Sequence, residues 1–297
     1  MDSPDVRKRL KLSIGLTFFV FLLEAVGGVI SGSLALLSDA GHMFGDVFSL
    51  TLSWFALRIA SQPVTSTRTY GYHRMEIFAA FINGVLLLTM AASILYEAVQ
   101  RFQAPAEVDS PMLVAVAAIG LAANLGVIFF LKDAAGHNHD LNVRSAFLHV
   151  IGDTIASVGV IVGGGIMWAT GWYLIDPLIA AAISMLLVWG GWRVLADSLH
   201  ILLEGVPKGI SLSEVERELT AIPAIQNVHE LHIWSICSNI YALSTHALVK
   251  DQKVNQVESI LHEAKDLLKN KFNITHSTIQ FESSPCQESG VRCNMDH

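Results

Sequence analysis

Long apolar runs separated by short polar links fill the first two-thirds of the chain. The hydrocarbon core of a bilayer is about 30 Å thick, so a helix needs roughly 20 mostly apolar residues to cross it. Segments of this length occur at residues 10–30, 34–60, 77–99, 113–131, 146–170 and 174–195. The pattern therefore predicts six membrane-spanning helices.

Charged residues return at ordinary density from about Pro207, and the apolar positions change their spacing. The runs SEVERELTAIP and KVNQVESILHEAKDLLKNKF have helical periodicity, whereas IQNVHELHIWSI, IYALSTHALV and HSTIQFES are typical of strands. The order helix, strand, strand, helix, strand predicts a small α/β domain of ferredoxin-like, or metallochaperone-like, type. We therefore divide the chain into a transport domain at 1–206 and an aqueous domain at 207–297.

Composition agrees with a membrane domain joined to an aqueous one. Hydrophobic residues make up 52% of the 297 residues and charged residues only 15%, against roughly 25% charged in an average soluble domain. A net charge of -7, without a basic patch among aromatics, argues against nucleic acid as a partner. Three cysteines, all late in the chain, are too few for a disulfide framework and favour a reducing compartment.

The basic residues of the short loops predict the orientation in the membrane. Basic loops stay in the cytoplasm, and nearly all of these residues flank one set of alternate loops, with only Arg101 on the opposite side. The cytoplasmic set comprises Arg7, Lys8, Arg9, Lys11, Arg58, Arg68, Arg74, Lys132 and Arg144. Six spans with the N-terminus inside return the chain to the cytoplasm, so both termini are expected there.

Two predicted spans carry the same pair of ionisable residues. His42 and Asp46 are four residues apart in SDAGHMFGDVFSL, and His149 and Asp153 have that spacing in SAFLHVIGDTIAS. Each pair projects from one helical face, and buried ionisable residues in spans indicate a functional site. Together they offer two nitrogens and two oxygens, a tetrahedral set that favours zinc.

A structural interpretation competes with this one. The histidines could be satisfied core residues and the aspartates could pair with Lys or Arg. The interiors of the two spans contain no basic residue to act as a counter-ion, which favours metal ligation. A single polar residue in the first span, Glu24, is expected to join helices by a hydrogen bond, and glycines spaced four apart, such as Gly28 with Gly32, indicate close helix packing.

Five motifs spread over nearly the whole chain carry a family resemblance. They are SGSLALLSDAGHMFGDVFSL, YGYHRMEIFAAFINGV, LNVRSAFLHVIGDTIASVGVI, DPLIAAAIS and LLEGVP. In these motifs the chain is similar to the cation diffusion facilitator family, in particular its zinc-transporting branch. The resemblance implies a homodimer that exports zinc from the cytoplasm by alternating access, in exchange for protons, with His42, Asp46, His149 and Asp153 as the transport site.

The same resemblance bears on substrates, cofactors and location. Zinc is expected both as the transported ion and as a regulatory ion, with Cd²⁺ and Co²⁺ as further candidate substrates and without an organic cofactor or enzymatic activity. The motifs are similar to those of bacterial members and of vesicular eukaryotic members. The bacterial inner membrane is the expected location, with a vesicular membrane as the alternative.

The aqueous domain carries a second set of candidate ligands. By position, His229, His246 and Glu282 match the family's cytoplasmic metal site. In a regular strand His229 would share a face with Leu231 and Ile233, and His232 would lie on the opposite face. Taken singly, each histidine is also explained as a surface or packed residue. Further candidate ligands are His232, His276, Cys286, Cys293, His137, His139 and His73.

Two other classes of function stay open from the residues alone. A zinc-dependent intramembrane enzyme would use metal-activated water, but the chain lacks an HExxH pattern. A membrane metal sensor would use the spans only as anchors, which leaves the buried His/Asp pairs unexplained. Only a transporter would accumulate metal ions in vesicles without turning over another substrate.

Overall fold

The computed structural model describes residues 4–137, 141–251 and 253–284, with side chains described for 15–129, 150–251, 253 and 255–284. The predicted spans appear there as six helices of 27 to 30 residues. They are α1 (Pro4–Ser31), α2 (Leu34–Ala60), α3 (Arg74–Gln103), α4 (Ser110–His137), α5 (Leu141–Thr170) and α6 (Ile175–Leu202). Among the described residues, α2 to α6 are long and apolar enough to cross a membrane, and the described apolar part of α1, Gly15–Ser31, is shorter.

The chain forms two compact units that do not coincide with a simple cut in the sequence. One unit contains Met1–Leu52 and Ile82–Val194, and the other contains Ser53–Phe81 and Leu195–His297. The first unit holds most of the membrane-spanning helices, and the second contains the sheet together with the loop between α2 and α3.

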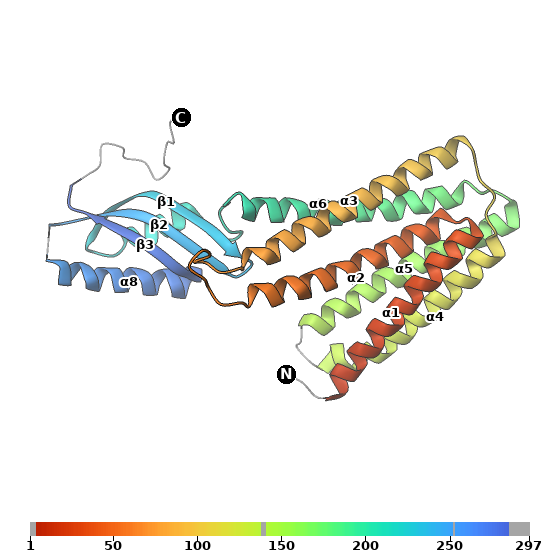
Figure 1. Ribbon diagram of the computed structural model, residues 1–297, viewed down its shortest axis with the longest axis horizontal. Helices are drawn as coiled ribbons and strands as arrows, with labels where there is room; N and C mark the ends of the chain where they lie inside the picture. Colours follow the sequence, from red (N-terminus) through yellow and green to blue (C-terminus); the bar gives the residue numbers. More distant parts are fainter. Residues whose placement is uncertain (1–3, 138–140, 252, 285–297) are drawn as a thin grey trace. The chain divides into compact units, whose positions relative to one another are not determined.

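Small residues bring the helices of the first unit close together. A Cβ atom added at Gly27 of α1 would lie 2.7 Å from Val116 of α4, and one at Gly164 of α5 would lie 2.4 Å from Leu113 of α4. Helices α1, α4 and α5 accordingly lie side by side (Figure 1). Gly28 likewise faces Leu37 at 2.9 Å, as its spacing predicted, whereas Gly32 has φ +72° and forms the turn between α1 and α2.

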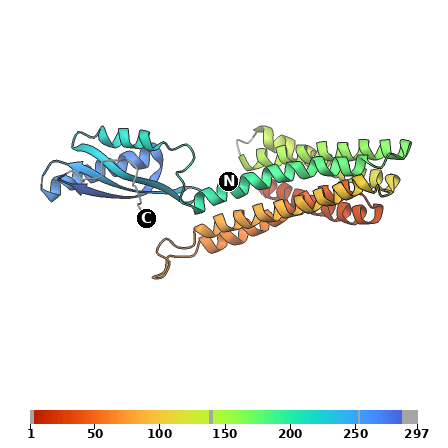
Figure 2. The same cartoon turned by 90° about the horizontal axis from the view of Figure 1, so that it is seen from above.

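The second unit contains the predicted α/β domain in the predicted order. Its elements are α7 (Leu212–Thr220), β1 (Ile225–Cys237), β2 (Ile240–Val249), α8 (Val254–Phe272) and β3 (Ile274–Glu282). Strands β1 and β2 form an antiparallel hairpin, and β3 pairs with β2 in parallel after the crossover through α8. Figures 1 and 2 show the three strands side by side, with α8 running along the sheet.

One face of the sheet packs on both short helices. Apolar side chains spaced three and four apart on α7 and α8 meet alternate residues of the strands, as expected for amphipathic helices on a sheet. The buried cluster includes Val215, Leu219, Ile260, Ala264, Leu268, Val228, Leu231, Ile233, Leu243, Ala247 and Ile274. Helix α8 ends at Phe272, and the left-handed φ of 55° at the next residue, Asn273, turns the chain directly into β3. The opposite face of the sheet is therefore left for other contacts.

This core predicts a large effect of one truncation. Leu268 is fully buried in the cluster, so Leu268→Ala should destabilise a fragment of residues 207–297 by about 2 to 5 kcal/mol. Urea unfolding measures this change. Lys265→Ala on the exposed side of the same helix is the matched control and should change stability by less than about 0.5 kcal/mol. Equal effects of the two substitutions would contradict the packing described here.

Candidate metal sites

His42 and Asp46 of α2 meet Asp153 of α5 inside the membrane-spanning unit. The Nε2 atom of His42 lies 3.7 Å from Oδ2 of Asp46 and 3.8 Å from Oδ1 of Asp153. The side chain of Asp153 is 8% exposed, while those of His42 and Asp46 are each 34% exposed. Ligands of a tetrahedral zinc ion at about 2.0 to 2.2 Å are about 3.3 to 3.6 Å apart, so these spacings are close to those of a metal-bound set.

The side chain of His149, the fourth candidate ligand of this set, lies outside the described residues. His149 is in helix α5, one turn before Asp153. Residues one turn apart share a helical face. Helix α2 carries a further buried carboxyl group, Asp39, which is 3% exposed.

Glu24 of α1 is a further buried carboxyl group in a span. It is 1% exposed, and its Oε2 atom has no hydrogen-bond partner among the described residues. The expected hydrogen bond between helices is therefore absent at this atom. Its other oxygen fits against Gly120 of α4, where an added Cβ would lie 2.6 Å away. Glycine at position 120 thus makes room for the carboxyl group.

The structure brings together His229, His246 and Glu282 in the second unit. Their ligand atoms lie within 4.8 Å of one another. The ring nitrogen Nδ1 of His246 is 2.8 Å from Oε1 of Glu282, and Nε2 of His229 is 3.3 Å from Oε2 of the same carboxylate. His229 is buried, and the other two are partly exposed. A metal ion would replace the proton shared by the imidazole and the carboxylate.

A β-bulge decides which face of the sheet carries His229. Val228, which precedes His229, pairs with Ala247 in the core. Ile233, which follows His232, pairs with Leu243 in the core. Since neighbouring residues of a strand point to opposite faces, His229 and His232 both lie on the face away from the core. The expectation that His229 shares a face with Leu231 and Ile233 was therefore wrong. The register shifts between His229 and His232, and an extra residue in one strand reverses the alternation.

The bulge also introduces a residue that periodicity could not find. Glu230 has a positive φ of 48°, which is uncommon for a residue other than glycine. Its Oε2 atom lies 3.6 Å from Nε2 of His246, on the ring nitrogen that does not face Glu282. Carboxylates in this place orient metal-binding imidazoles. The sequence signal for Glu230 was only its position between two candidate histidines.

Two of the remaining candidate ligands have described side chains and do not join this group. His276 is exposed on β3, with its ring 6.3 Å from that of Tyr70, and His73 is half-buried before α3. Four candidates fall outside the described side chains: His137, His139, Cys286 and Cys293.

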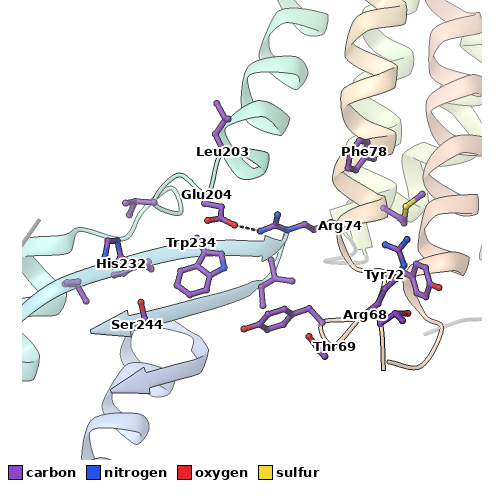
Figure 3. A pocket seen from close by; sticks show the side chains of 18 of the residues that line it. Arg68, Thr69, Tyr72, Arg74, Phe78, Leu203, Glu204, His232, Trp234 and Ser244 are labelled. Atoms are coloured by element: carbon purple, nitrogen blue, oxygen red, sulfur yellow. Dashed lines mark hydrogen bonds and ion pairs between the residues drawn. The ribbon is translucent and has the colours of Figure 1, made fainter. Parts of the chain in front are cut away.

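His232 lines a separate cavity of about 1130 Å³ within the second unit. Figure 3 shows its wall, with His232, Trp234 and Ser244 of the sheet on one side and Arg68 and Tyr72 of the loop on the other. A salt bridge of 2.9 Å joins Arg74 to Glu204 there (Figure 3). The three metal-ligand candidates are not part of this wall.

Two family models together match nearly all of the described chain. Residues 10–203 match the cation efflux transmembrane domain, and residues 207–284 match the cytoplasmic domain of cation efflux proteins. The chain therefore belongs to the cation efflux, or cation diffusion facilitator, family. It is a multi-pass membrane protein and a divalent cation transporter, which confirms the predicted family, fold class and general function.

Several relatives match over nearly their full length. The metal cation efflux system protein CzcD of Cupriavidus metallidurans is 42% identical over 97% of this chain and 90% of its own. The solved metal-bound C-terminal domain of CzcD is 42% identical, covering 25% of this chain and 99% of its own with a TM-score of 0.23. A cadmium, cobalt and zinc/H⁺-K⁺ antiporter of Bacillus subtilis is 40% identical over 93% and 89%. The zinc transporter ZitB of Escherichia coli is 36% identical over 100% and 93%.

The close approach at Gly120 yields a prediction. Gly120→Ala puts a methyl group 2.6 Å from Glu24, and overpacking of this kind typically costs about 1 to 3 kcal/mol. The apparent melting temperature of the detergent-solubilised protein should fall by several degrees. Gly126→Ala, in the same helix with open space around the added atom, should leave it nearly unchanged. A double substitution with Glu24→Ala should recover part of the loss, because it removes the group that clashes.

Proposed function

We propose that this chain exports zinc from the cytoplasm in exchange for protons, with His42, Asp46, His149 and Asp153 as the transport site. The observation that carries the proposal is one imidazole nitrogen held within 3.8 Å of carboxylates from two different spans. The names of the relatives support zinc as the substrate, with cadmium and cobalt as further ions, and one of the names supports protons as counter-ions.

The charges of the proposed site account for exchange. Two neutral imidazoles and two carboxylates neutralise one Zn²⁺, so the loaded site carries no net charge in a medium that stabilises charge poorly. Without metal, the two carboxylates repel each other. The same ligand atoms bind either zinc or protons, so a site that opens alternately to the two sides of the membrane would exchange one for the other.

We assign a regulatory role to His229, His246 and Glu282. The burial of His229 and the two short contacts to Glu282 provide a preformed set of ligands, with Glu230 holding the outer nitrogen of His246. Zinc binding would lower the negative charge of this domain and favour closer approach of two copies in a homodimer. Both copies of this domain, and the N- and C-termini of each chain, would lie in the cytoplasm. The membrane would be the inner membrane of a bacterium.

The alternative functions lack a supporting observation. An intramembrane hydrolase needs a general base beside an open coordination position, whereas both carboxylates at His42 lie at ligand spacing. We therefore assign neither enzymatic activity nor an organic cofactor. A sensor that uses the spans only as anchors would not need carboxylates of two different spans beside one imidazole.

The transport site can be tested by changing one ligand. His42→Asp replaces a nitrogen ligand by a hard oxygen, so the preference for zinc over manganese should fall by about tenfold, which corresponds to about 1.4 kcal/mol. Proteoliposome flux of both metals measures the ratio. His262→Asp makes the same chemical change at an exposed position of helix α8 and should keep the parent ratio. An unchanged ratio in His42→Asp would remove His42 from the ligand set.

The regulatory site can be tested by calorimetry on residues 207–297. His246→Ala combined with Glu282→Ala should lower zinc affinity by at least about 100-fold, and Glu230→Gln alone by about tenfold, since groups that orient ligands contribute on that scale. His262→Ala should bind zinc as the parent fragment does. Parent-like affinity in the double variant would show that zinc binds elsewhere.

A further inference from the structure

Asp176, in the first turn of α6, is fully buried and binds the start of α2. Its two carboxylate oxygens accept hydrogen bonds from Oγ of Ser33 at 2.5 Å, the backbone N–H of Leu34 at 2.7 Å and that of Ala35 at 3.2 Å. The first N–H groups of a helix have no partners within the helix. A carboxylate from α6 therefore caps α2 and meets the positive end of its dipole.

Arg101 of α3 completes this junction. Its Nη1 atom donates to the carbonyl oxygen of Gly32 at 2.5 Å and lies 3.5 Å from Asp176. Gly32 provides the left-handed turn between α1 and α2, and the backbone N–H of Asp109, just before α4, donates to the carbonyl of Ser31. Arg101, which also binds Glu97 of its own helix at 3.1 Å, thus places a positive charge beside Asp176. Helices α3 and α6 and the residue before α4 all contact the segment that joins α1 to α2.

A second contact between α2 and α6 lies one turn further along. The Oγ of Ser38 is 3.4 Å from Oγ of Ser184 and 3.4 Å from the carbonyl oxygen of Ala180. Both serines are fully buried. His42 and Asp46 follow Ser38 on the same side of α2 at steps of four residues, about 6 and 12 Å along the axis. The proposed metal ligands therefore continue the stripe that anchors α2 to α6.

We propose that Asp176 is a positioning residue that holds the start of α2 on α6 throughout the transport cycle, so that the segment carrying His42 and Asp46 moves about this fixed end. The proposal rests on the alternating-access function proposed above. Separating α2 from α6 here would remove three hydrogen-bond donors from a fully buried carboxylate and leave two backbone N–H groups of α2 without partners. Both losses are strongly unfavourable. Contacts of that strength suit a point that stays closed in both states, whereas a gate must open in every cycle.

A disulfide across the second contact distinguishes a fixed point from a gate. Ser38→Cys and Ser184→Cys are combined in a chain whose Cys237, Cys286 and Cys293 are replaced by serine. The present separation of 3.4 Å between the two Oγ atoms is compatible with a disulfide after a small adjustment. Metal flux into proteoliposomes is compared before and after oxidation, and the single Ser38→Cys variant controls for effects of the oxidant. Oxidised double variants should retain at least half of the reduced flux; its loss on oxidation would identify a gate and overturn the proposal.

Adding Asp176→Asn to the chain that carries Ser38→Cys and Ser184→Cys tests the role of the Asp176 carboxylate itself. Under reducing conditions flux should fall by about tenfold or more, which corresponds to losing one hydrogen bond to a charged group. Oxidation should then restore flux, because the covalent bond replaces the lost anchor; a direct role in binding or moving ions would not be rescued in this way. A folded, monodisperse Asp176→Asn protein that the disulfide fails to rescue would contradict the proposal.

The flux is read with zinc, cadmium and cobalt in parallel. Transport of only cadmium or cobalt would contradict zinc export, and the comparison of oxidised with reduced protein would still decide the role of Asp176. Zinc export and the positioning role of Asp176 can therefore be refuted independently of each other.

Discussion

Polar groups inside a membrane need partners, because the bilayer core has no water to supply them. In this protein that requirement places carboxylates where helices must meet. Asp176 on α6 caps the first turn of α2, and Asp153 on α5 meets His42 two turns further along α2. The first turn of helix α2 is therefore held by hydrogen bonds to α6 that need no water or ion. Further along, α2 and α5 place His42 and Asp153 at a spacing suited to a metal ion.

The same requirement separates a carboxylate that anchors helices from the carboxylates of the proposed transport site. Asp176 is fully buried and accepts three hydrogen bonds beside a guanidinium, so it is satisfied without any ion. The carboxylates at His42 lie at ligand spacing from an imidazole, an arrangement that a divalent cation would complete. Buried polar residues in spans are thus best interpreted by counting the donors around them.

In the aqueous domain, backbone geometry has a comparable role. Helices α7 and α8 cover one face of the sheet, so the opposite face is available for polar chemistry. The bulge at Glu230 transfers His229 to that face, opposite His246 on β2 and near Glu282 on β3. The positive φ of Glu230 is an unfavourable backbone conformation, and the pairing of the surrounding strands holds it in place. Conformations of this kind are common at functional sites.

The sequence by itself determined the spans, the order of elements in the sheet domain and the paired His/Asp motifs, because each depends on local spacing along one helix or strand. It also determined the family. Only the tertiary structure decided that His42 faces Asp153, that Glu24 lies against Gly120 and that Asp176 caps α2, since these contacts join segments from different helices. The bulge escaped prediction for another reason: a one-residue shift reverses every side chain beyond it, and periodicity assumes that no such shift occurs.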